Sequence, residues 1–500
     1  MSLYASWRRA YNQVVRSDLF DLVDLELDAS REQILMGGRH LFSRLRDAFD
    51  RVDQIGVIGW GPQGRAQAMN LRDSLGPTGV TVAVGLRAGS PSKEDARRAG
   101  FSESDGTLGE MFDVIRGSDL VILLVSDAAL VELSDEIFAA LRPDAVIGLA
   151  HGFLLAHLEA TGRRFPGTHS VIAVCPKGMG ASVRRLYEQG RDLDGAGINC
   201  SVVVHQDVDG RACDLALGWA VALGAPFIFE TTLRSECRSD LVGERAILLG
   251  VPHAIAEAVY RHSIEAGDDP RRAFVRSTES MTGPLARTIS RGGIRAVLRG
   301  LVGDDRRIFD DAYCATYTAF TPLLAELYDE VDSCNEITSV RLASRRLGAH
   351  PLDRVDGSRM WLVGDDVRRR RGEHDVAIDP LTAGIFCGAM VAQIDLLRDR
   401  NHPWSEIANE SVIELVDSLI PYMHARGIAS MIDNCSTTAR LGARKWEPRF
   451  EAAVTQQVLP ALDAFGAGDE GRLAALEAHP IHDVLASIAS YRPELEIAVP

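Results

Sequence analysis

The sequence predicts an α/β domain built on a parallel, doubly wound sheet, followed by an all-helical domain. Short apolar runs alternate with helical stretches up to about residue 230, which is the pattern of strands joined by crossover helices. From about residue 235 onward, apolar residues instead recur at i, i+3 and i+4, and β-branched runs are few. A chain of 500 residues is also too long for one ordinary core. We therefore expect domains at residues 1–232 and 233–500.

The first domain is expected to begin with an arm of helical segments over residues 1–50. A helix is predicted over residues 65–75, directly after the first strand. Each strand candidate is a short apolar run bounded by turn residues, as buried strands of a parallel sheet are. The candidates are residues 53–58, 80–85, 119–125, 145–149 and 171–175.

A glycine-rich turn separates the first strand from this helix. Gly59 permits the tight turn, Gly61 lets backbone approach a pyrophosphate, and Gly64 lets helix and strand pack closely. Phosphates bind at such a helix N-terminus because its free N–H groups and its dipole favour negative charge. The position of the motif directly after a strand indicates a Rossmann-type dinucleotide site.

The end of the second strand indicates which dinucleotide is bound. An NAD site usually places an acidic residue there, to accept from the ribose hydroxyl. This chain instead has Arg87, Ser90 and Ser92, which are donors and suit a 2′-phosphate. We therefore expect NADPH rather than NADH.

Two pairs of carboxylates in the second domain predict a metal site. Asp240 and Glu244 are four residues apart, as are Glu410 and Glu414, so each pair lies on one face of a helix. Two such faces that meet across a helical bundle form an all-oxygen site suited to Mg²⁺.

A further acidic residue lies four positions before each pair: Glu236 before Asp240, and Glu406 before Glu410. Spacing alone therefore leaves open which members of each series bind metal. The two similar series also predict that the helical domain contains an internal duplication.

The amino-acid composition limits which binding partners and which cellular compartment are expected for this protein. A net charge of -16 disfavours binding to nucleic acid or to an anionic membrane. The eight cysteines show no C-x-x-C spacing, which disfavours a zinc site and indicates reduced thiols. We expect no membrane-spanning segment. The composition favours the cytoplasm of a bacterium, with a plastid as the alternative if a transit peptide has been removed.

Six motifs are distributed over nearly the whole chain. They are I-G-V-I-G-W-G-P-Q-G, A-H-G-F, C-P-K-G-M-G-A-S-V-R-R-L-Y, S-D-L-V-G-E-R, N-E-S-V-I-E and D-N-C-S-T-T-A-R-L-G. Together they resemble the ketol-acid reductoisomerases, in the long, plant-type form. The resemblance implies a magnesium-assisted alkyl shift in a 2-acetohydroxy acid, followed by NADPH reduction to a 2,3-dihydroxy acid, in branched-chain amino-acid synthesis.

The resemblance also implies roles for individual residues. It implies that two Mg²⁺ ions are held by Asp240, Glu244, Glu410 and Glu414, with Glu236 near the site but not a direct ligand. The family forms dimers or larger homo-oligomers. The other implied roles are catalysis by His151, Lys177 and Glu244, substrate binding by Ser436, and cofactor binding by Gln63, Ser126 and Asp127 in addition to the residues above.

Two other functions fit parts of the sequence. An NADP-dependent hydroxyacid dehydrogenase would share the nucleotide turn and the helical second half, but it would not need four carboxylates. A nucleotide-sensing protein with a decayed site would be expected to lose the metal ligands first, yet all four are present.

Overall fold

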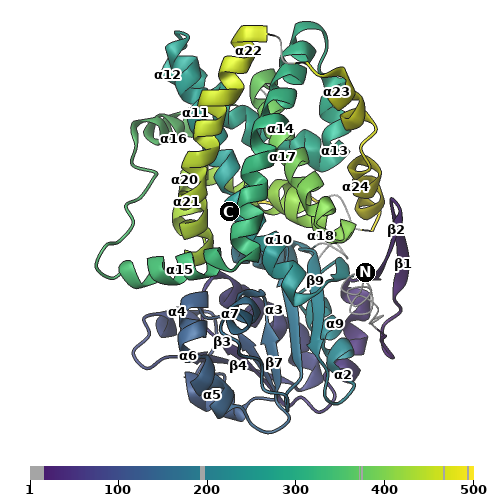
Figure 1. The fold of residues 1–500 in the computed structure, drawn as a ribbon. Coiled ribbons are helices and arrows are strands. Elements are labelled where there is room, and N and C mark those ends of the chain that lie inside the picture. Colours follow the sequence, from purple (N-terminus) through teal and green to yellow (C-terminus); the bar gives the residue numbers. More distant parts are fainter. Residues whose placement is uncertain are drawn as a thin grey trace.

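The computed structural model describes residues 16–191, 197–370, 372, 376–465, 468–491 and 495–499. In Figure 1 the strands gather in the lower part of the molecule, and long helices rise above them. Helix α10 (Leu233–Arg245) lies where the two parts meet. The predicted fold class, a Rossmann-type domain joined to an all-helical domain, is confirmed.

The sheet of the first part has the strand order β1-β2-β10-β9-β8-β7-β6-β3-β4-β5 among the described residues. Neighbours are parallel except at β1/β2, β2/β10 and β8/β9, which are antiparallel. The strands are β1 (Val23–Leu27), β2 (Ser30–Met36), β3 (Gln54–Ile58), β4 (Thr81–Leu86), β5 (Leu108–Glu110), β6 (Leu120–Leu123), β7 (Val146–Leu149), β8 (Val171–Pro176), β9 (Cys200–Gln206) and β10 (Phe227–Glu230).

The five predicted strands are present as β3, β4, β6, β7 and β8, but two predictions were wrong. The sheet is mixed rather than parallel, because large doubly wound sheets accept antiparallel strands toward one edge. The predicted helical arm contains the hairpin of β1 and β2, and in β1 the buried residues Leu25 and Leu27 alternate with exposed ones. The first 15 residues of that arm lie outside the described part of the chain.

Both faces of the sheet are buried, and successive residues of one strand point into different cores. In β6, Leu120 and Ile122 join one hydrophobic cluster, whereas Val121 and Leu123 join the other. The second cluster continues into the helical part of the molecule. The helices around the sheet are η1 (Arg39–Arg44), α2 (Leu45–Ala48), α3 (Pro62–Leu75), η2 (Gly76–Thr78), α4 (Ser92–Arg98), α5 (Met111–Gly117), α6 (Asp127–Ala140), α7 (Phe153–Ala160), α8 (Gly180–Gln189) and α9 (Ala212–Ala222).

The strand order reverses at β3. The chain passes from β3 to β4 and β5 on one side, and it returns to β6, β7 and β8 on the other. Ligands of open α/β sheets bind at such a switch point, beyond the carboxyl ends of the strands. The glycine-rich turn follows β3 and therefore lies at this point.

The helical part is arranged around two long helices, α14 (Gly303–Asp332) and α17 (Pro380–Asp399), that cross closely. A Cβ atom on Gly388 would lie 2.7 Å from the carbonyl oxygen of Tyr313, so glycine permits the approach. The helices that follow α10 are α11 (Gly250–Glu265), α12 (Pro270–Phe274), η3 (Val275–Glu279), η4 (Met281–Leu285), α13 (Ala286–Gly300), α14 (Gly303–Asp332), α15 (Asn335–Arg346), α16 (Arg359–Arg370), α17 (Pro380–Asp399), α18 (Trp404–Ala408), η5 (Asn409–Leu419), α19 (Ile420–Arg426), α20 (Ile428–Asn434), α21 (Thr437–Ala453), η6 (Val454–Val458), α22 (Leu459–Phe465), α23 (Glu470–Glu477) and α24 (Ile481–Ala489).

Helix α17 has the length and mean hydropathy of a membrane span, which the sequence interpretation did not anticipate. In the structure, 83% of its apolar window is buried inside the molecule, against α14 and other helices. A core helix of a large helical domain has this same composition.

The helix that carries Glu410 and Glu414 differs from the α-helix assumed above. Residues Asn409–Leu419 form the π-helical segment η5, whose backbone bonds run from i to i+5. Segments of this kind are rare and are frequent at functional sites.

Helix α18, which leads into η5, is capped by a residue from the other end of the chain. The carboxylate of Glu32 on β2 accepts hydrogen bonds from the backbone N–H groups of Trp404 and Ser405, at 2.7 and 3.1 Å. The residue before the helix, Pro403, provides no side-chain cap. The β1–β2 hairpin therefore fixes the start of the segment that presents the second carboxylate pair.

The variant Glu32→Ala should lower the free energy of unfolding by about 1–2 kcal/mol, the usual cost of a lost helix cap. Urea denaturation measures this loss. Glu26→Ala on the exposed side of β1 is the matched control and should leave the transition unchanged. Equal stability of the two variants would contradict the capping role.

Candidate active site

The predicted carboxylates meet at the junction between sheet and helices. Ligand oxygens of Glu236, Asp240 and Glu410 all lie within 4.8 Å of one another. The first two project from α10 and the third from η5, so the two acidic series do face each other as predicted. Glu236 is part of this group, although the sequence had placed it outside the direct ligands.

Lys177 binds two of these carboxylates. It follows β8, is almost fully buried, and its Nζ lies 2.7 Å from both carboxylate oxygens of Glu236. The same Nζ donates to Oε1 of Glu410. Burial alone would lower the pKa of Lys177, but the charges of Glu236 and Glu410 raise it well above its usual value. Lys177 is therefore a fixed cation that holds α10 and η5 together.

His151 lies on the other side of Asp240. It follows β7, and its Nε2 is 2.8 Å from Oδ2 of Asp240, while its Nδ1 is 3.9 Å from Oδ1 of Asp127. Burial disfavours the charged imidazole, but the charge of Asp240 outweighs it and raises the pKa of His151 to about 10. His151 is therefore protonated and lies next to Asp240, one of the clustered carboxylates.

The remaining carboxylates lack enough positive partners. Burial and the neighbouring Asp240 raise the pKa of Glu244 to about 8. Burial and like charges also raise the pKa values of Glu410 and Glu414 well above normal. Oε2 of Glu410 is buried and has no hydrogen-bond partner among the described residues. A set of clustered, buried oxygen donors with such unmet acceptor capacity fits a hard divalent cation.

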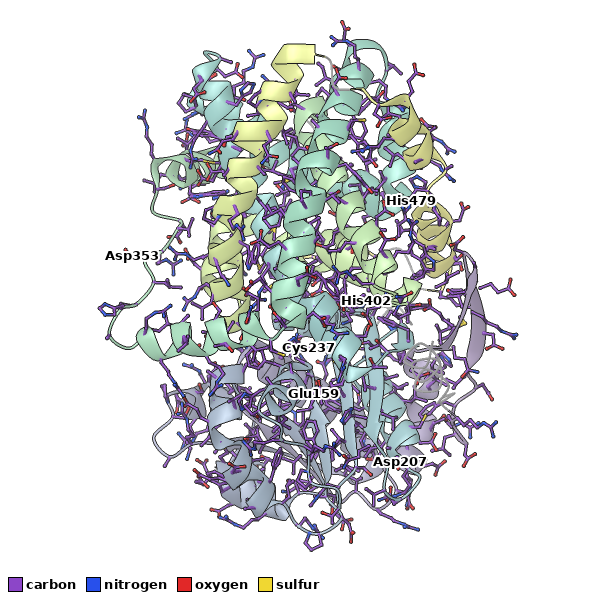
Figure 2. All side chains as sticks on the ribbon, in the orientation of Figure 1. Glu159, Asp207, Cys237, Asp353, His402 and His479 are labelled. Carbon is purple, nitrogen blue, oxygen red and sulfur yellow. The ribbon has the colours of Figure 1, made fainter. Side chains whose placement is uncertain are left out.

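Glu406 was left open as an alternative ligand, and the structure gives it another role. It accepts hydrogen bonds from Thr231 and from Ser235, the latter at 2.8 Å, and pairs with His402 at 2.5 Å. Burial would raise its pKa, but the charge and hydrogen bond of His402 lower it to about 2. Glu406 is thus fully buried, and its carboxylate is hydrogen-bonded within the protein. Figure 2 shows its partner His402 near the junction of the two parts.

Behind Glu244, a buried ion pair fixes the end of α10. Arg245 is fully buried; its Nε donates to Glu336 at 2.6 Å and its Nη1 lies 3.5 Å from Glu244. Glu336 also accepts from Lys445 and from the indole of Trp446. This network links α10 to α15 and α21.

The glycine turn has the geometry that a dinucleotide site needs. Gly59 has φ of +114°, which favours glycine. A Cβ on Gly64 would lie 2.5 Å from the carbonyl oxygen of Gly59, so close packing excludes a side chain there. Around Gly61 the space is open, as required for a phosphate to reach the backbone.

The residues predicted to select NADPH lie beside this turn. Arg87 is exposed, Ser90 is partly buried, and Ser92 begins α4. The backbone N–H of Ser92 donates to Oγ of Ser90 at 3.3 Å. Asp95 of α4 accepts from the indole of Trp60 at 2.7 Å, which holds α4 against the glycine turn.

Other predicted residues make contacts within the protein. Gln63 donates to the carbonyl oxygen of Gly178 at 2.7 Å and so fixes the loop that follows Lys177. Ser126 is the residue before α6, and Asp127 accepts from Thr438 of α21. Oγ of Ser436 accepts from the N–H of Ala439 at 3.0 Å, and Ser436 is exposed.

Sequence reasoning missed several supporting residues. Ser201 donates to Glu236 at 2.8 Å, but it lies on β9, a strand that was not predicted. Thr438 lies two residues beyond Ser436, inside a quoted motif, and no spacing rule would have paired it with Asp127. The partners Arg245 and Glu336 are 91 residues apart, so only the fold brings them together.

Fold and site together define a two-domain oxidoreductase with a dinucleotide-binding sheet and a buried carboxylate centre. Residues 51–226 match the family described as acetohydroxy acid isomeroreductase, NADPH-binding domain. Residues 233–373 match the ketol-acid reductoisomerase C-terminal domain. The chain belongs to the ketol-acid reductoisomerase family.

Individual relatives agree with this assignment. The chain is 50% identical to the chloroplastic ketol-acid reductoisomerase of Pisum sativum, over 97% of this chain and 85% of that protein. It is 49% identical to the corresponding protein of Spinacia oleracea, over 97% and 83%. A solved structure, an NADH-preferring ketol-acid reductoisomerase from an uncultured archaeon, shares the fold with a TM-score of 0.55 and 23% identity, over 66% of this chain and 97% of that one.

The variant Asp240→Asn should lower the pKa of His151 in metal-free protein, because it removes the nearest negative charge. The imidazole should then titrate well below its value of about 10 in the parent chain. Histidine ring signals followed by NMR against pH report this shift. Asp127→Asn, with its more distant carboxylate, should shift the titration less; an unchanged titration in Asp240→Asn would contradict the assignment.

Proposed function

We propose that this chain converts 2-acetolactate or 2-aceto-2-hydroxybutanoate to the 2,3-dihydroxy acid, by a magnesium-dependent alkyl migration followed by reduction with NADPH. The observation that carries the proposal is the cluster of Glu236, Asp240 and Glu410, the first and third buried and Asp240 partly buried, at the junction with the NADPH-binding domain. A hydride transfer alone needs no such cluster, whereas an alkyl shift between adjacent carbons, which moves charge from one substrate oxygen to the next, does.

The chain's own residues have separate tasks in this proposal. Asp240, Glu244, Glu410 and Glu414 would hold two Mg²⁺ ions, which when bound would act as Lewis acids on adjacent substrate oxygens. Lys177 keeps Glu236 and Glu410 together and offsets their repulsion.

The proton relays and the substrate contact come from residues around this cluster. His151 holds a proton at the edge of the cluster, next to Asp240. Glu244 would take part in proton transfer only through a relayed water, because bound Mg²⁺ would keep its carboxylate ionised. Ser436, exposed at the start of α21, would bind the substrate carboxylate.

A hydroxyacid dehydrogenase without isomerase activity is the second candidate. It would use the nucleotide turn and His151 or Lys177, but Lys177 is enclosed between two carboxylates and is not free to meet a substrate alone. The metal requirement distinguishes the two functions.

NADPH as the preferred coenzyme is supported by Arg87, Ser90 and Ser92 beside the turn. Some relatives are named for NADP(+) and others for NAD(+). One named for NAD(+), the ketol-acid reductoisomerase of Desulfosudis oleivorans, is 32% identical over 64% of this chain and 90% of that protein. The proposed preference of this chain for NADPH therefore rests on Arg87, Ser90 and Ser92 and not on membership of the family.

Self-association and location are further parts of the proposal. We propose a homodimer or a larger homo-oligomer, which size-exclusion chromatography with light scattering would measure. The plant relatives are named as chloroplastic. Those names are consistent with a plastid and do not support the bacterial cytoplasm expected from composition.

The decisive assay is NADPH consumption on addition of 2-acetolactate with Mg²⁺. Turnover should be lost with a chelator, and Glu410→Gln should lower kcat at least about a hundredfold, because a metal-ligand carboxylate is removed. Glu326→Gln on the exposed side of α14 is the matched control and should retain activity. Chelator-insensitive reduction of simple 2-keto acids would favour the dehydrogenase instead.

Magnesium uptake at pH 7 should release protons, because the pKa of Glu244 is about 8 and those of Glu410 and Glu414 are also raised. Calorimetry in two buffers of different ionisation enthalpy measures this release, which should be about one proton or more per chain. Glu414→Gln should release less. Binding heats independent of the buffer would show that the cluster is already ionised.

The variant Arg87→Ala should raise KM for NADPH about tenfold, the effect of losing one charge-assisted contact to phosphate, and leave KM for NADH nearly unchanged. Steady-state kinetics with each coenzyme test this. An equal rise for both coenzymes would place Arg87 outside the 2′-phosphate site.

A further inference from the structure

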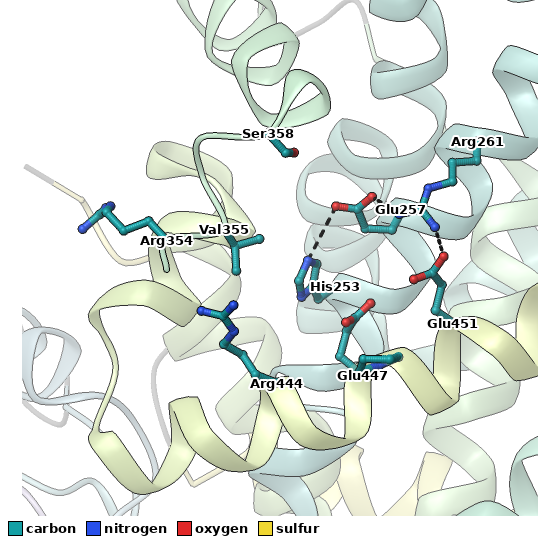
Figure 3. Close-up of a pocket in the computed structure, with 10 residues that line it drawn as sticks. His253, Glu257, Arg261, Arg354, Val355, Ser358, Arg444, Glu447 and Glu451 are labelled. Carbon is teal, nitrogen blue, oxygen red and sulfur yellow. Dashed lines mark hydrogen bonds and ion pairs between the residues drawn. The ribbon is translucent and has the colours of Figure 1, made fainter. Parts of the chain in front are cut away.

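A second polar pocket lies in the helical part of the molecule. It has a volume of about 350 Å³ and is walled by α11, by α21 and by the segment between α15 and α16 (Figure 3). None of the residues assigned above to metal, coenzyme or substrate lines it. Its size is within the usual range of small-molecule sites.

Two buried side chains that line this pocket each have a polar group with no hydrogen bond or ion pair to the described residues. His253 is 5% exposed, and its Nδ1 has no hydrogen-bond partner among the described residues. Glu447 is 8% exposed, and the charges of His253, Arg261 and Arg444 act on its carboxylate without a direct hydrogen bond or ion pair within the described part of the chain. Figure 3 shows the two side chains on neighbouring walls, directed toward each other. Buried polar groups are normally paired, so this arrangement points to a ligand.

His253 has a second contact on the other side of its ring. Its Nε2 lies 3.7 Å from Oε1 of Glu257, one turn along α11. An imidazole that donates through Nε2 accepts through Nδ1. The pocket can therefore present two acceptors, Nδ1 of His253 and the carboxylate of Glu447, which suits a ligand ammonium group.

The positive side of the pocket is Arg444. It lies one turn before Glu447 on α21, and its Nη1 donates to the backbone oxygen of Asp353. It has no carboxylate partner among the described residues, whereas Arg261 pairs with both Glu257 and Glu451. The pocket thus has one unpaired guanidinium and one unpaired carboxylate.

Other ligand classes fit these charges less well. A divalent cation would find one unpaired carboxylate and one imidazole nitrogen, next to Arg444 and Arg261. An inorganic anion would bind Arg444 but would meet the carboxylate of Glu447. A molecule with one anionic and one cationic group satisfies both.

We propose that this pocket binds a small zwitterion of the α-amino acid class. Arg444 takes the carboxylate of the ligand, and Glu447 and Nδ1 of His253 take its ammonium group. The ligand would bridge α11, which follows α10, and α21, which begins next to Ser436. Binding is measured without substrate, so the inference does not depend on the proposed reaction.

The test is calorimetry of the full chain with each standard L-amino acid, up to about 10 mM, a concentration that detects even weak binding. At least one should bind. Arg444→Gln and Glu447→Gln should each weaken that binding about tenfold or more, because each removes a charge-assisted contact. Arg449→Gln is the matched control, since Arg449 lies on the same helix but pairs with Glu326 outside the pocket.

The ligand series adds a test that needs no variant. The amine and the acid that correspond to the bound amino acid, each lacking one charge, should fail to bind to the parent chain. Binding of no amino acid would overturn the proposal, as would binding unaffected by both substitutions. Binding of Mg²⁺ alone that Glu447→Gln abolishes would also overturn it, because the pocket would then be a metal site.

Discussion

The structure depends on one buried ionic contact, in which Lys177 joins Glu236 of α10 to Glu410 of η5. Three elements distant in sequence, the end of β8, the first helix after the sheet and a late π-helical segment, converge on its ammonium group. Removing one member of a buried pair of this kind typically costs roughly 3–5 kcal/mol, because the remaining charge is left unpaired. The same contact that joins the two parts of the molecule therefore also assembles the carboxylate centre.

The functional consequence of this arrangement is a surplus of negative charge in the carboxylate cluster. Lys177 and His151 together neutralise only part of the negative charge of the cluster. Burial and the remaining negative charge raise the pKa values of Glu244, Glu410 and Glu414. The folded chain holds these carboxylates together through contacts behind them, such as Arg245 with Glu336 and the Glu32 cap on α18. A site held in this way is preorganised for a cation and for charge that develops in a reaction.

Much of this arrangement could be predicted from local sequence patterns. The turn of Gly59, Gly61 and Gly64 is local, so its strand, helix and position at the switch point followed from the motif. Four-residue spacing placed Asp240 and Glu410 on helix faces. It could not show that Glu406 is sequestered by His402, or that Glu236 joins the cluster, because those outcomes depend on packing between distant segments. The β1–β2 hairpin was missed although burial alternates in β1, and its role becomes clear only from the contact of Glu32 with α18.

The most direct measurement is anomalous diffraction from crystals grown with Mn²⁺ in place of Mg²⁺. Two anomalous peaks are expected among Asp240, Glu244, Glu410 and Glu414, close to Lys177 and His151. Peaks at other positions, or no peak within the cluster at saturating Mn²⁺, would contradict the claim that these carboxylates are the metal centre.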